Sequence, residues 1–393
     1  MVMFTSDGAS MMLGKLNGMV AQLKCDIPHL VQQHCIAHWE DLGISDAWKE
    51  VKLIRDIRTL MRTVYMVFFR SSRRKCKFQE IMDASECESA AFRPHNKVRW
   101  LSRHFAVRAI IRIYNPLLEY FEQDKDTDPV SKYCHKKLNT MGYRITLEVL
   151  NDVLSELASL STLLQKWGLT PLEAFHLARD KLNKIRRQYL GDSVLWSDKV
   201  KALLDMSSQE NNEIDTISII TFINILCAHL ADRFPEDEVQ EWSTFDCAAI
   251  VKCDFNFGIH QVKSLCSKYK NFLAEEIVIV SQYNDFKFAV AERIKSQLLL
   301  SFPDMVTFAH QNEQFQDLAE LMDIGGTFLA SSADCEHGVS LMNTLKNKLL
   351  NCLQVDHLDM LMCVKSYQLD GGLIDLDRGY IEWANEKDRR EKQ

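Results

Sequence analysis

A single acidic side chain follows an apolar segment close to the N-terminus. The stretch reads FTSDGASMMLG, in which Asp7 is followed at once by Gly8, and Gly14 comes soon after. An α/β protein can present a carboxylate in this way at the carboxyl end of a strand. There, one or two carboxylates hold Mg²⁺ together with waters and phosphates. An aspartate that caps the following turn would show the same pattern, so Asp7 is a candidate metal ligand with a structural alternative.

A second group of chemically active side chains lies in CDIPHLVQQHCIAHW. This stretch holds Cys25, His29, His34, Cys35 and His38. Thiolate and imidazole are zinc ligands, and Cys35 and His38 have a usable spacing. A structural zinc site needs four ligands in tetrahedral reach, however, and in a strand Cys35 and His38 would point to opposite faces. A buried cysteine among polar histidines is the alternative that we favour.

A third candidate lies in SADCEHGVSLMNTLKNKLLNCL near the C-terminus. Glu336 falls in the first turn of an expected helix, where the helix dipole favours a carboxylate and where a capping role is common. Leucine then recurs at every fourth position, as Leu341, Leu345, Leu349 and Leu353. A stripe of this kind is typical of a core or an oligomer interface.

A fourth candidate is the stretch KVRWLSRH. Arg99 beside an exposed Trp100 could contact a phosphate and stack on a base, with Lys97 and Arg103 nearby. A core tryptophan with solvated cations around it is the commoner case. The basic run RSSRRKCKF, Arg70–Phe78, could touch phosphates too, with a solvated loop as the alternative.

Composition limits the class of protein. The chain has 393 residues, 47% of them hydrophobic, which allows a substantial core and two or three domains. A net charge of -7 requires that any DNA contact come from local patches. The 12 cysteines form no compact framework and no signal-peptide pattern precedes them, so we expect reduced thiols. The apolar run Ile217–Ala231 is short for a membrane span and predicts a buried helix, so we expect no membrane.

The secondary structure expected around these candidates changes along the chain, from mixed strand and helix to helix. Strand, short helix and second strand are expected over residues 1–40, with the second strand in HLVQQHCIAHW. Apolar residues then recur at helical spacing, with a kink or a break at Pro116 and a break at Gly168 and Pro171. A further break is expected over Phe302–Ala309, followed by a loop, a long helix, a short helix and a charged last helix. The fold class is therefore mainly α with a small α/β part.

Together and in this order, several stretches resemble one family. They are SDGASMMLGKLNGMVAQL, HCIAHW, KVRWLS and SSADCEHGVSLMNTLKNKLLNCLQVDHLDMLM, with IDLDRGYIEWANEKDRREK at the end. The chain resembles the C-terminal part of a hAT-superfamily DNA transposase, or of a domesticated protein derived from one, such as the hAT-derived zinc-finger proteins. The resemblance implies a truncated RNase H-like fold interrupted by a large all-helical insertion. It divides the chain into a partial RNase H-like segment (1–40), the insertion domain (41–305), and a C-terminal RNase H-like helix with the hAT dimerisation region (306–393).

The resemblance also assigns roles to residues. Active members use two Asp and one Glu to bind two divalent cations, which stabilise both oxygens of an in-line phosphoryl displacement. By motif match, Asp7 is the second Asp and Glu336 is the Glu. Cys35 and His38 match a Cys-x-x-His element that supports the active site and DNA.

Two further motifs imply contacts with other molecules. Arg99 and Trp100 match an Arg-Trp element whose Trp stacks on a flipped base at a DNA hairpin end. The leucine stripe from Leu341 to Leu353 matches the dimerisation region.

The departures from the family pattern indicate lost catalysis. Only 6 residues precede Asp7, so we expect the strand that carries the first catalytic Asp to be absent. The family Glu is followed by Arg, and Phe-Ser comes two residues later, whereas this chain reads Glu336-His337-Gly338-Val339-Ser340. We therefore expect no enzyme activity, and no cofactor other than Mg²⁺ or Mn²⁺ in an active form.

The leading hypothesis is a nuclear, non-catalytic interaction protein that dimerises through its C-terminal helices, with the cytoplasm as a second location. Its expected partners are a second copy or related hAT-derived proteins, and DNA or chromatin. One alternative is a two-metal transposase or nuclease that is active only with a further N-terminal portion. The other is a zinc-stabilised helical scaffold that uses the group from Cys25 to His38.

Overall fold

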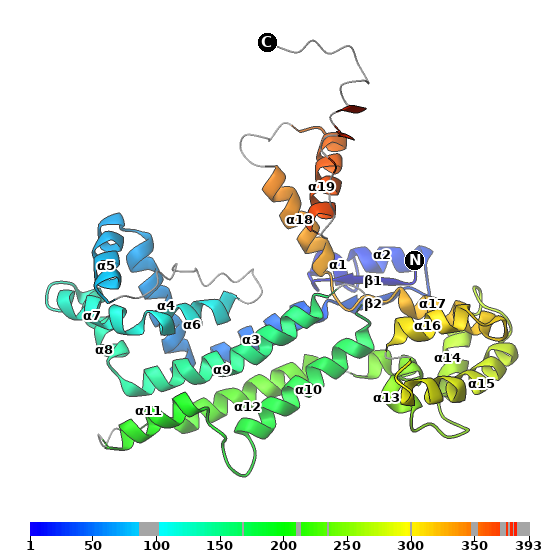
Figure 1. Cartoon of the computed structure of the whole chain (residues 1–393), viewed down its shortest axis with the longest axis horizontal. Coiled ribbons are helices and arrows are strands. Elements are labelled where there is room, and N and C mark those ends of the chain that lie inside the picture. The colour runs from blue at the N-terminus through cyan, green and yellow to red at the C-terminus, as the bar shows by residue number, and fades with distance from the viewer. Residues whose placement is uncertain are drawn as a thin grey trace. The chain divides into compact units, whose positions relative to one another are not determined.

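The structure is a computed structural model that describes residues 1–85, 102–166, 169–209, 214–233, 236–298, 301–346, 353–369, 375, 378–379 and 381–382. The chain forms two compact units, Met1–Ser332 and Ala333–Gln393, and each is described by itself. The described residues are mostly helical and include a parallel sheet of two strands (Figure 1). The expected class, mainly α with a small α/β part, is confirmed. The RNase H-like assignment and the division at residues 40 and 305 stay predictions.

The elements follow one another in a simple order. The first unit begins with β1 (Met3–Ser6), α1 (Ser10–Leu13), α2 (Met19–Asp26), β2 (Val31–His34), α3 (Ile36–Glu50), α4 (Lys52–Phe69), α5 (Ser72–Ala84), α6 (Ser102–Arg112), α7 (Tyr114–Asp124), α8 (Pro129–Leu138) and α9 (Met141–Leu164). It continues with α10 (Pro171–Tyr189), α11 (Asp198–Gln209), α12 (Thr216–Arg233), the 3-10 helix η1 (Glu236–Phe245), α13 (Cys247–Ile250), α14 (Ile259–Lys268), α15 (Glu276–Lys295), α16 (Phe302–His310), η2 (Glu313–Phe315) and α17 (Gln316–Gly326). The second unit contains α18 (Ala333–Leu345) and α19 (Val355–Leu369).

The two strands are parallel and in register, from Met3 opposite Val31 to Ser6 opposite His34. The connection between them contains α1 and α2. Parallel pairing places both carboxyl ends at one edge of the sheet, so the residues that follow β1 and β2 are neighbours. The backbone N–H of Cys35 donates to the carbonyl of Ser6 at 2.7 Å, which fixes this edge.

The second strand is shorter than expected, because HLVQQHCIAHW changes from strand to helix at Cys35. The extended part ends at His34, and α3 begins at Ile36. Ile36, Glu40 and Ala47 are buried at a helical spacing, so the apolar face of α3 already includes residues that the sequence pattern assigned to a strand. The expectation that Cys35 and His38 lie in a strand, on opposite faces, is therefore wrong.

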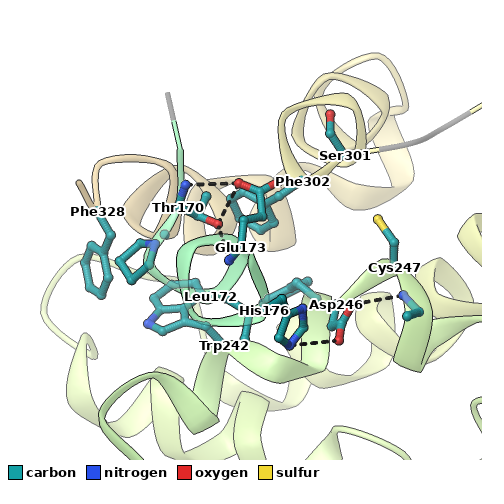
Figure 2. Close-up of a pocket in the computed structure, with 14 residues that line it drawn as sticks. Thr170, Leu172, Glu173, His176, Trp242, Asp246, Cys247, Ser301, Phe302 and Phe328 are labelled. Atoms are coloured by element: carbon teal, nitrogen blue, oxygen red, sulfur yellow. Dashed lines mark hydrogen bonds and ion pairs between the residues drawn. The ribbon is translucent and has the colours of Figure 1, made fainter. Parts of the chain in front are cut away.

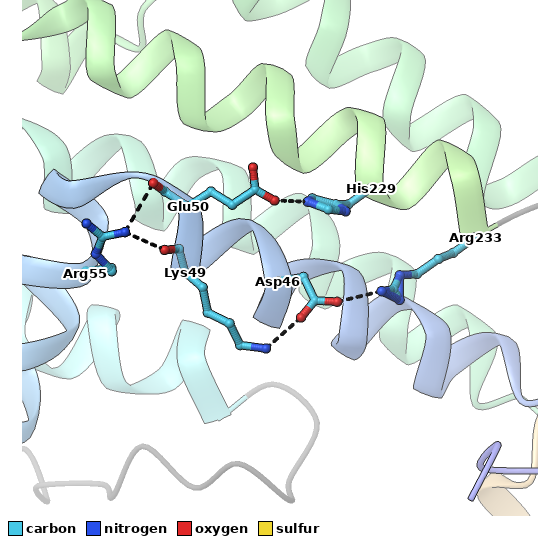
Figure 3. Close-up of polar contacts among 6 residues, drawn as sticks. All are labelled: Asp46, Lys49, Glu50, Arg55, His229 and Arg233. Carbon is cyan, nitrogen blue, oxygen red and sulfur yellow. Dashed lines mark hydrogen bonds and ion pairs between the residues drawn. The ribbon is translucent and has the colours of Figure 1, made fainter. Parts of the chain in front are cut away.

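The junction between α3 and α4 is a sharp break at Val51, whose backbone is extended with φ -93° and ψ 125°. Arg55 Nη1 donates to the carbonyls of Lys49 and Glu50 at 2.7 and 3.3 Å (Figure 3). These carbonyls belong to the last turn of α3, where helical partners are missing. The side chain of Arg55 in α4 therefore supplies hydrogen bonds to carbonyls at the end of the preceding helix, α3.

Helix α12 packs along α3, and two ion pairs join them on the same side (Figure 3). Arg233 Nη2 lies 2.6 Å from Asp46 Oδ2, and His229 contacts Glu50. By length and composition α12 could also cross a membrane. Its apolar residues Ile219, Phe222 and Leu226 are buried in the core of the first unit, as expected for a core helix.

The first unit has two hydrophobic cores. The first core is built mainly by α3, α4, α6–α10 and α12, and the second by η1 and α13–α17. Helix α10 connects them and begins with a capping box. There the backbone N–H of Thr170 donates to Glu173 Oε2 at 3.0 Å, the Thr170 hydroxyl accepts from the N–H of Glu173 at 3.3 Å, and Pro171 is the first helical residue. This start matches the signal that the sequence showed.

Two expectations about the end of the first unit are wrong. The expected break over Phe302–Ala309 is helix α16, and Pro303 stands in its first turn, where the missing N–H removes no hydrogen bond. The Ser301 hydroxyl caps this helix by accepting from the N–H of Asp304 at 3.4 Å. The loop expected to begin at ELMDIGG begins later, because this stretch is helical within α17 and the non-helical segment before α18 is residues 327–332.

The C-terminal unit begins with α18, which contacts α19. Glu336 is the fourth residue of α18, as the sequence predicts for its first turn. Most of the expected last helix lies outside the described residues.

Candidate functional site

The turn after β1 holds Asp7 at the carboxyl edge of the sheet. Asp7 is exposed, and its Oδ1 accepts a hydrogen bond from the backbone N–H of Ala9 at 3.1 Å. The residue between them, Gly8, has a φ of +80°. An aspartate that bonds two residues ahead in this way stabilises a tight turn. The geometry therefore favours the structural role of Asp7 that the sequence left open.

The ring of His34 lies directly against Gly8. A Cβ atom added to Gly8 would stand 2.1 Å from Cε1 of His34, far inside a normal contact. The parallel register causes this approach, because it brings the end of β2 beside the end of β1. The turn that positions Asp7 therefore needs glycine for two reasons, the positive φ and the imidazole ring.

His34 is held as a neutral ring. Its ring centroid lies 5.5 Å from that of His38 and 4.9 Å from that of Trp39. Burial is the main cause that lowers the pKa of His34 to about 4, and the neighbouring His38 lowers it further while Asp7 opposes the shift. Within the part of the chain that the structure describes, Nε2 of His34 has no hydrogen-bond partner. The site thus pairs one exposed carboxylate with one uncharged imidazole.

Cys35 joins this edge to the end of the first unit. It is fully buried, its Sγ lies 3.5 Å from the Ser331 hydroxyl, and it accepts from the N–H of Ser332 at 3.3 Å. Nearby, the N–H of Ile36 donates to the carbonyl of Ala330 at 3.0 Å. The thiol is therefore a structural contact, as the alternative of a buried cysteine predicts.

The five possible zinc ligands do not converge. Cys25 is exposed on α2, where its thiol donates to the carbonyl of Ala21 at 3.5 Å, and the ring of His29 lies edge-on to Phe272. Among the described residues, no three His, Cys, Asp or Glu side chains are grouped so that they could hold a metal. The donors around Asp7 in the first unit therefore do not fit a two-cation site, and we derive no metal-dependent step from them.

The remaining candidates are distributed over both units. Asp7 lies in the first unit and Glu336 in the second, so their pairing stays a prediction. Leu341, Leu345 and Leu353 are partly exposed in the second unit. Arg99, Trp100 and Leu349 lie outside the described residues.

Most of the basic run at Arg70–Phe78 is helical rather than a loop, from Ser72 onwards. It forms the start of α5, with the Ser71 hydroxyl accepting from the N–H of Arg74. Arg74 lies 3.0 Å from Asp128 Oδ2, and Lys77 lies 2.6 Å from Asp124 Oδ1. These carboxylates partly neutralise the positive charge that phosphates would otherwise meet.

Sequence reasoning did not single out Glu40, which is buried in α3. Burial raises the pKa of Glu40 well above its usual value, and Ser161 and Arg103 oppose the shift. Arg103 itself pairs with Asp41. A glutamate within a helical pattern gives no signal of this environment, because its burial depends on the contact of α3 with α9.

A comparison of the chain with known protein-family models finds no matching family.

Proposed function

We propose that the chain is a non-catalytic, transposon-derived interaction protein that binds a second copy of itself through α18 and α19. The resemblance of this region to the hAT dimerisation region is one support. The other, which carries the proposal, is the exposure of apolar side chains in the C-terminal unit.

Few apolar side chains are fully buried among the described residues of the C-terminal unit, although several of its leucines and methionines are partly buried. Ala333 is the one core residue among them. Several large apolar side chains are between 39% and 81% exposed, namely Val339, Val355, Met360, Leu361, Val364, Tyr367 and Ile381. Isolated helices of this length are marginal in water, and most helical stability in proteins comes from packing an apolar face. A partner that covers these side chains would supply that packing.

The exposed side chains of α19 form a stripe. Met360, Val364 and Tyr367 are spaced at i, i+4 and i+7, which places them on one face of the helix. Complete burial of one Val or Met side chain contributes about 1.5–3 kcal/mol. A symmetric contact between two copies would bury both stripes against each other, so we propose a second copy as the partner.

Sedimentation velocity of the full chain tests this proposal. At about 20 µM, where a Kd near 1 µM would leave most chains paired, we expect the mass of a dimer. Val364→Asp places a charge in the stripe and is expected to give a monomer. Ser366→Asp adds the same charge on the same helix, away from the stripe, and is expected to remain a dimer.

Two results would contradict dimerisation through α19. One is a monomeric wild-type chain at 20 µM or above, and the other is an undiminished dimer in Val364→Asp. Circular dichroism of both variants serves as the folding control, because the cores of the first unit contain no residue of α19.

The non-catalytic part of the proposal is supported by the bond from Ala9 to Asp7, which gives this carboxylate a role in its turn. One observation favours the nuclease alternative, namely that Asp7 stands at the carboxyl edge of parallel strands. Nicking of supercoiled DNA with Mg²⁺ or Mn²⁺, by a form of the chain extended with a further N-terminal portion, separates the two functions. We expect no nicking by that form, and nicking that disappears in Asp7→Asn would establish the nuclease instead.

We further propose a nuclear location and DNA as a partner, with the motif at Arg99 and Trp100 as the contact. The support is the resemblance of that motif to the family's Arg-Trp element. A gel-shift titration with hairpin-ended DNA tests it, with Trp100→Ala expected to weaken binding because stacking contributes about 1–3 kcal/mol per base. Equal affinity of Trp100→Ala and the wild-type chain would contradict this contact.

A further inference from the structure

A cavity of about 240 Å³ opens within the first unit, where the two cores meet (Figure 2). Its walls come from the start of α10, the end of η1 with α13, the start of α16 and the end of α17. Four aromatic side chains form most of the apolar wall: Trp242, Phe245, Phe302 and Phe328. These residues come from three segments that are far apart in the sequence.

The aromatic wall is held in place by contacts between its own members. The rings of Trp242 and Phe328 meet edge to face with centroids 5.2 Å apart, and those of Phe245 and Phe302 with centroids 5.9 Å apart. Trp242 also packs closely on Gly325, where an added Cβ would stand 2.4 Å from its ring. Such interlocked rings favour a cavity that exists before a ligand arrives.

The polar side of the cavity is acidic. The Glu173 carboxylate accepts from the backbone N–H and the hydroxyl of Thr170 at 3.0 and 2.8 Å, which fixes it at the start of α10. Asp246 accepts from the N–H of Ala248 at 2.9 Å and lies 3.6 Å from Nε2 of His176. Both carboxylates face the same space (Figure 2). Among the lining residues that the structure describes, none is Lys or Arg.

The pKa of a thiol in the cavity wall responds to the same negative charge. Burial is the main cause that raises the pKa of Cys247 to about 11, and the carboxylates of Asp246, Glu173 and Asp304 raise it further. Three acidic groups therefore act on one point of the cavity wall. A cation placed there would be stabilised and an anion repelled, because charges interact strongly where water is partly excluded.

We propose that this cavity binds a small organic cation with a compact aromatic body. The aromatic body packs against the wall formed by Trp242 and Phe328, and the ammonium group faces Asp246 and Glu173. A cavity of about 150 Å³ is known to accept benzene, so the larger space here suits two fused rings. A positive group near an aromatic face is attracted by the ring in addition. Neither an anion nor a neutral molecule would use both sides of the cavity.

Three probes with the same ring and different charge test the proposal. Tryptamine is the cation, indole-3-ethanol the neutral control and indole-3-propionate the anion. Isothermal titration calorimetry of the full chain is expected to show one tryptamine per chain. Tryptamine should bind at least about tenfold more tightly than the alcohol, a difference of about 1.4 kcal/mol. The propionate should give no binding at the same concentrations.

Two conservative variants locate the site. Asp246→Asn and Glu173→Gln each remove a charge, while Asn still caps a helix and Gln still completes a capping box. Each is expected to weaken tryptamine binding about fivefold or more and to leave the affinity for the alcohol unchanged. Asp198→Asn removes a fully exposed carboxylate that does not line the cavity, and it should bind tryptamine as the wild-type chain does.

The proposal is overturned if tryptamine does not bind at millimolar concentration, or if the three probes bind equally. It is also overturned if Asp246→Asn and Glu173→Gln, shown to be folded by their thermal unfolding, bind tryptamine as the wild-type chain does. Binding of a basic peptide without binding of tryptamine would assign the cavity to a protein partner and would contradict a small-molecule site.

Discussion

Replacement of Gly8 by alanine tests how the turn that carries Asp7 is built. The backbone of Gly8 has a φ of +80°, and a left-handed conformation costs a residue with a Cβ about 1–2 kcal/mol. The added Cβ would also stand 2.1 Å from the His34 ring, so the ring must move. Overpacking of this kind costs about 1–3 kcal/mol. The two costs together amount to about 2–5 kcal/mol for opening of the sheet.

Amide hydrogen exchange at the sheet measures this cost where it arises. The N–H groups of Val31 and Cys35 donate hydrogen bonds to the carbonyls of Val2 and Ser6. These hydrogen bonds are lost when β1 and β2 separate. A destabilisation of 2 kcal/mol lowers their protection about 30-fold, since each 1.4 kcal/mol is tenfold. Gly8→Ala should show at least this loss.

A double-mutant cycle separates the two costs. In the background of His34→Ala the ring is gone, so Gly8→Ala should cost only the about 1–2 kcal/mol of the backbone. Gly326→Ala is the matched control, because nothing lies within 4 Å of its added Cβ, and it should be neutral or stabilising. If Gly8→Ala costs the same with and without His34, or no more than Gly326→Ala, the steric explanation is wrong.

Three further predictions concern stability, each measured by thermal unfolding of the full chain. Burial raises the pKa of Glu40 in the folded state above its value of 4.5 in the unfolded chain. The contribution of Glu40 to folding stability is therefore fully present below pH 4.5 and is lost as the pH rises through the folded-state pKa. Glu40→Gln should therefore be more stable than the wild type at pH 8, by about 1 kcal/mol or more, and should differ little from it at pH 4. An equal difference in stability at both pH values would contradict this explanation. Arg55→Gln removes the bonds to the carbonyls of Lys49 and Glu50 and should cost about 1 kcal/mol, whereas an unchanged midpoint would show that water replaces them. The buried Lys287 donates to two backbone carbonyls, at 2.6 and 3.1 Å, so Lys287→Met should cost about 1–3 kcal/mol, and a stabilised variant would refute its structural role.

Local signals in the sequence were sufficient for several elements. The apolar spacing from Ile54 to Val64 predicts the helix α4, and the pair of Gly168 and Pro171 marks the boundary before α10. The strand and turn at Asp7 follow from an apolar run that ends at Asp-Gly. Each of these depends on residues within one or two turns of chain, so its cause is visible in the sequence.

Other elements depend on contacts between distant segments. The start of α3 at Ile36 is stabilised by the burial of this side chain in the core and by the bond of its N–H to the carbonyl of Ala330. The proline in α16 suggested a break, but proline is compatible with the first turn of a helix, and only the course of the chain shows which applies. The same limit holds for the candidate site, where the sequence showed His34 as a possible zinc ligand and not as the ring that packs on Gly8.

The sequence by itself determined that this protein is mostly helical, that an acidic turn follows its first strand, and that apolar residues recur along its C-terminal helices. These properties follow from backbone preferences and from the spacing of side chains a few residues apart. The tertiary structure alone decided that His34 lies on the turn of Asp7, because only the parallel register brings the two strand ends together. It also decided that residues near 173, 246, 302 and 328 surround one cavity. Such neighbours are selected by the packing of whole helices, a free energy that no short stretch of sequence contains.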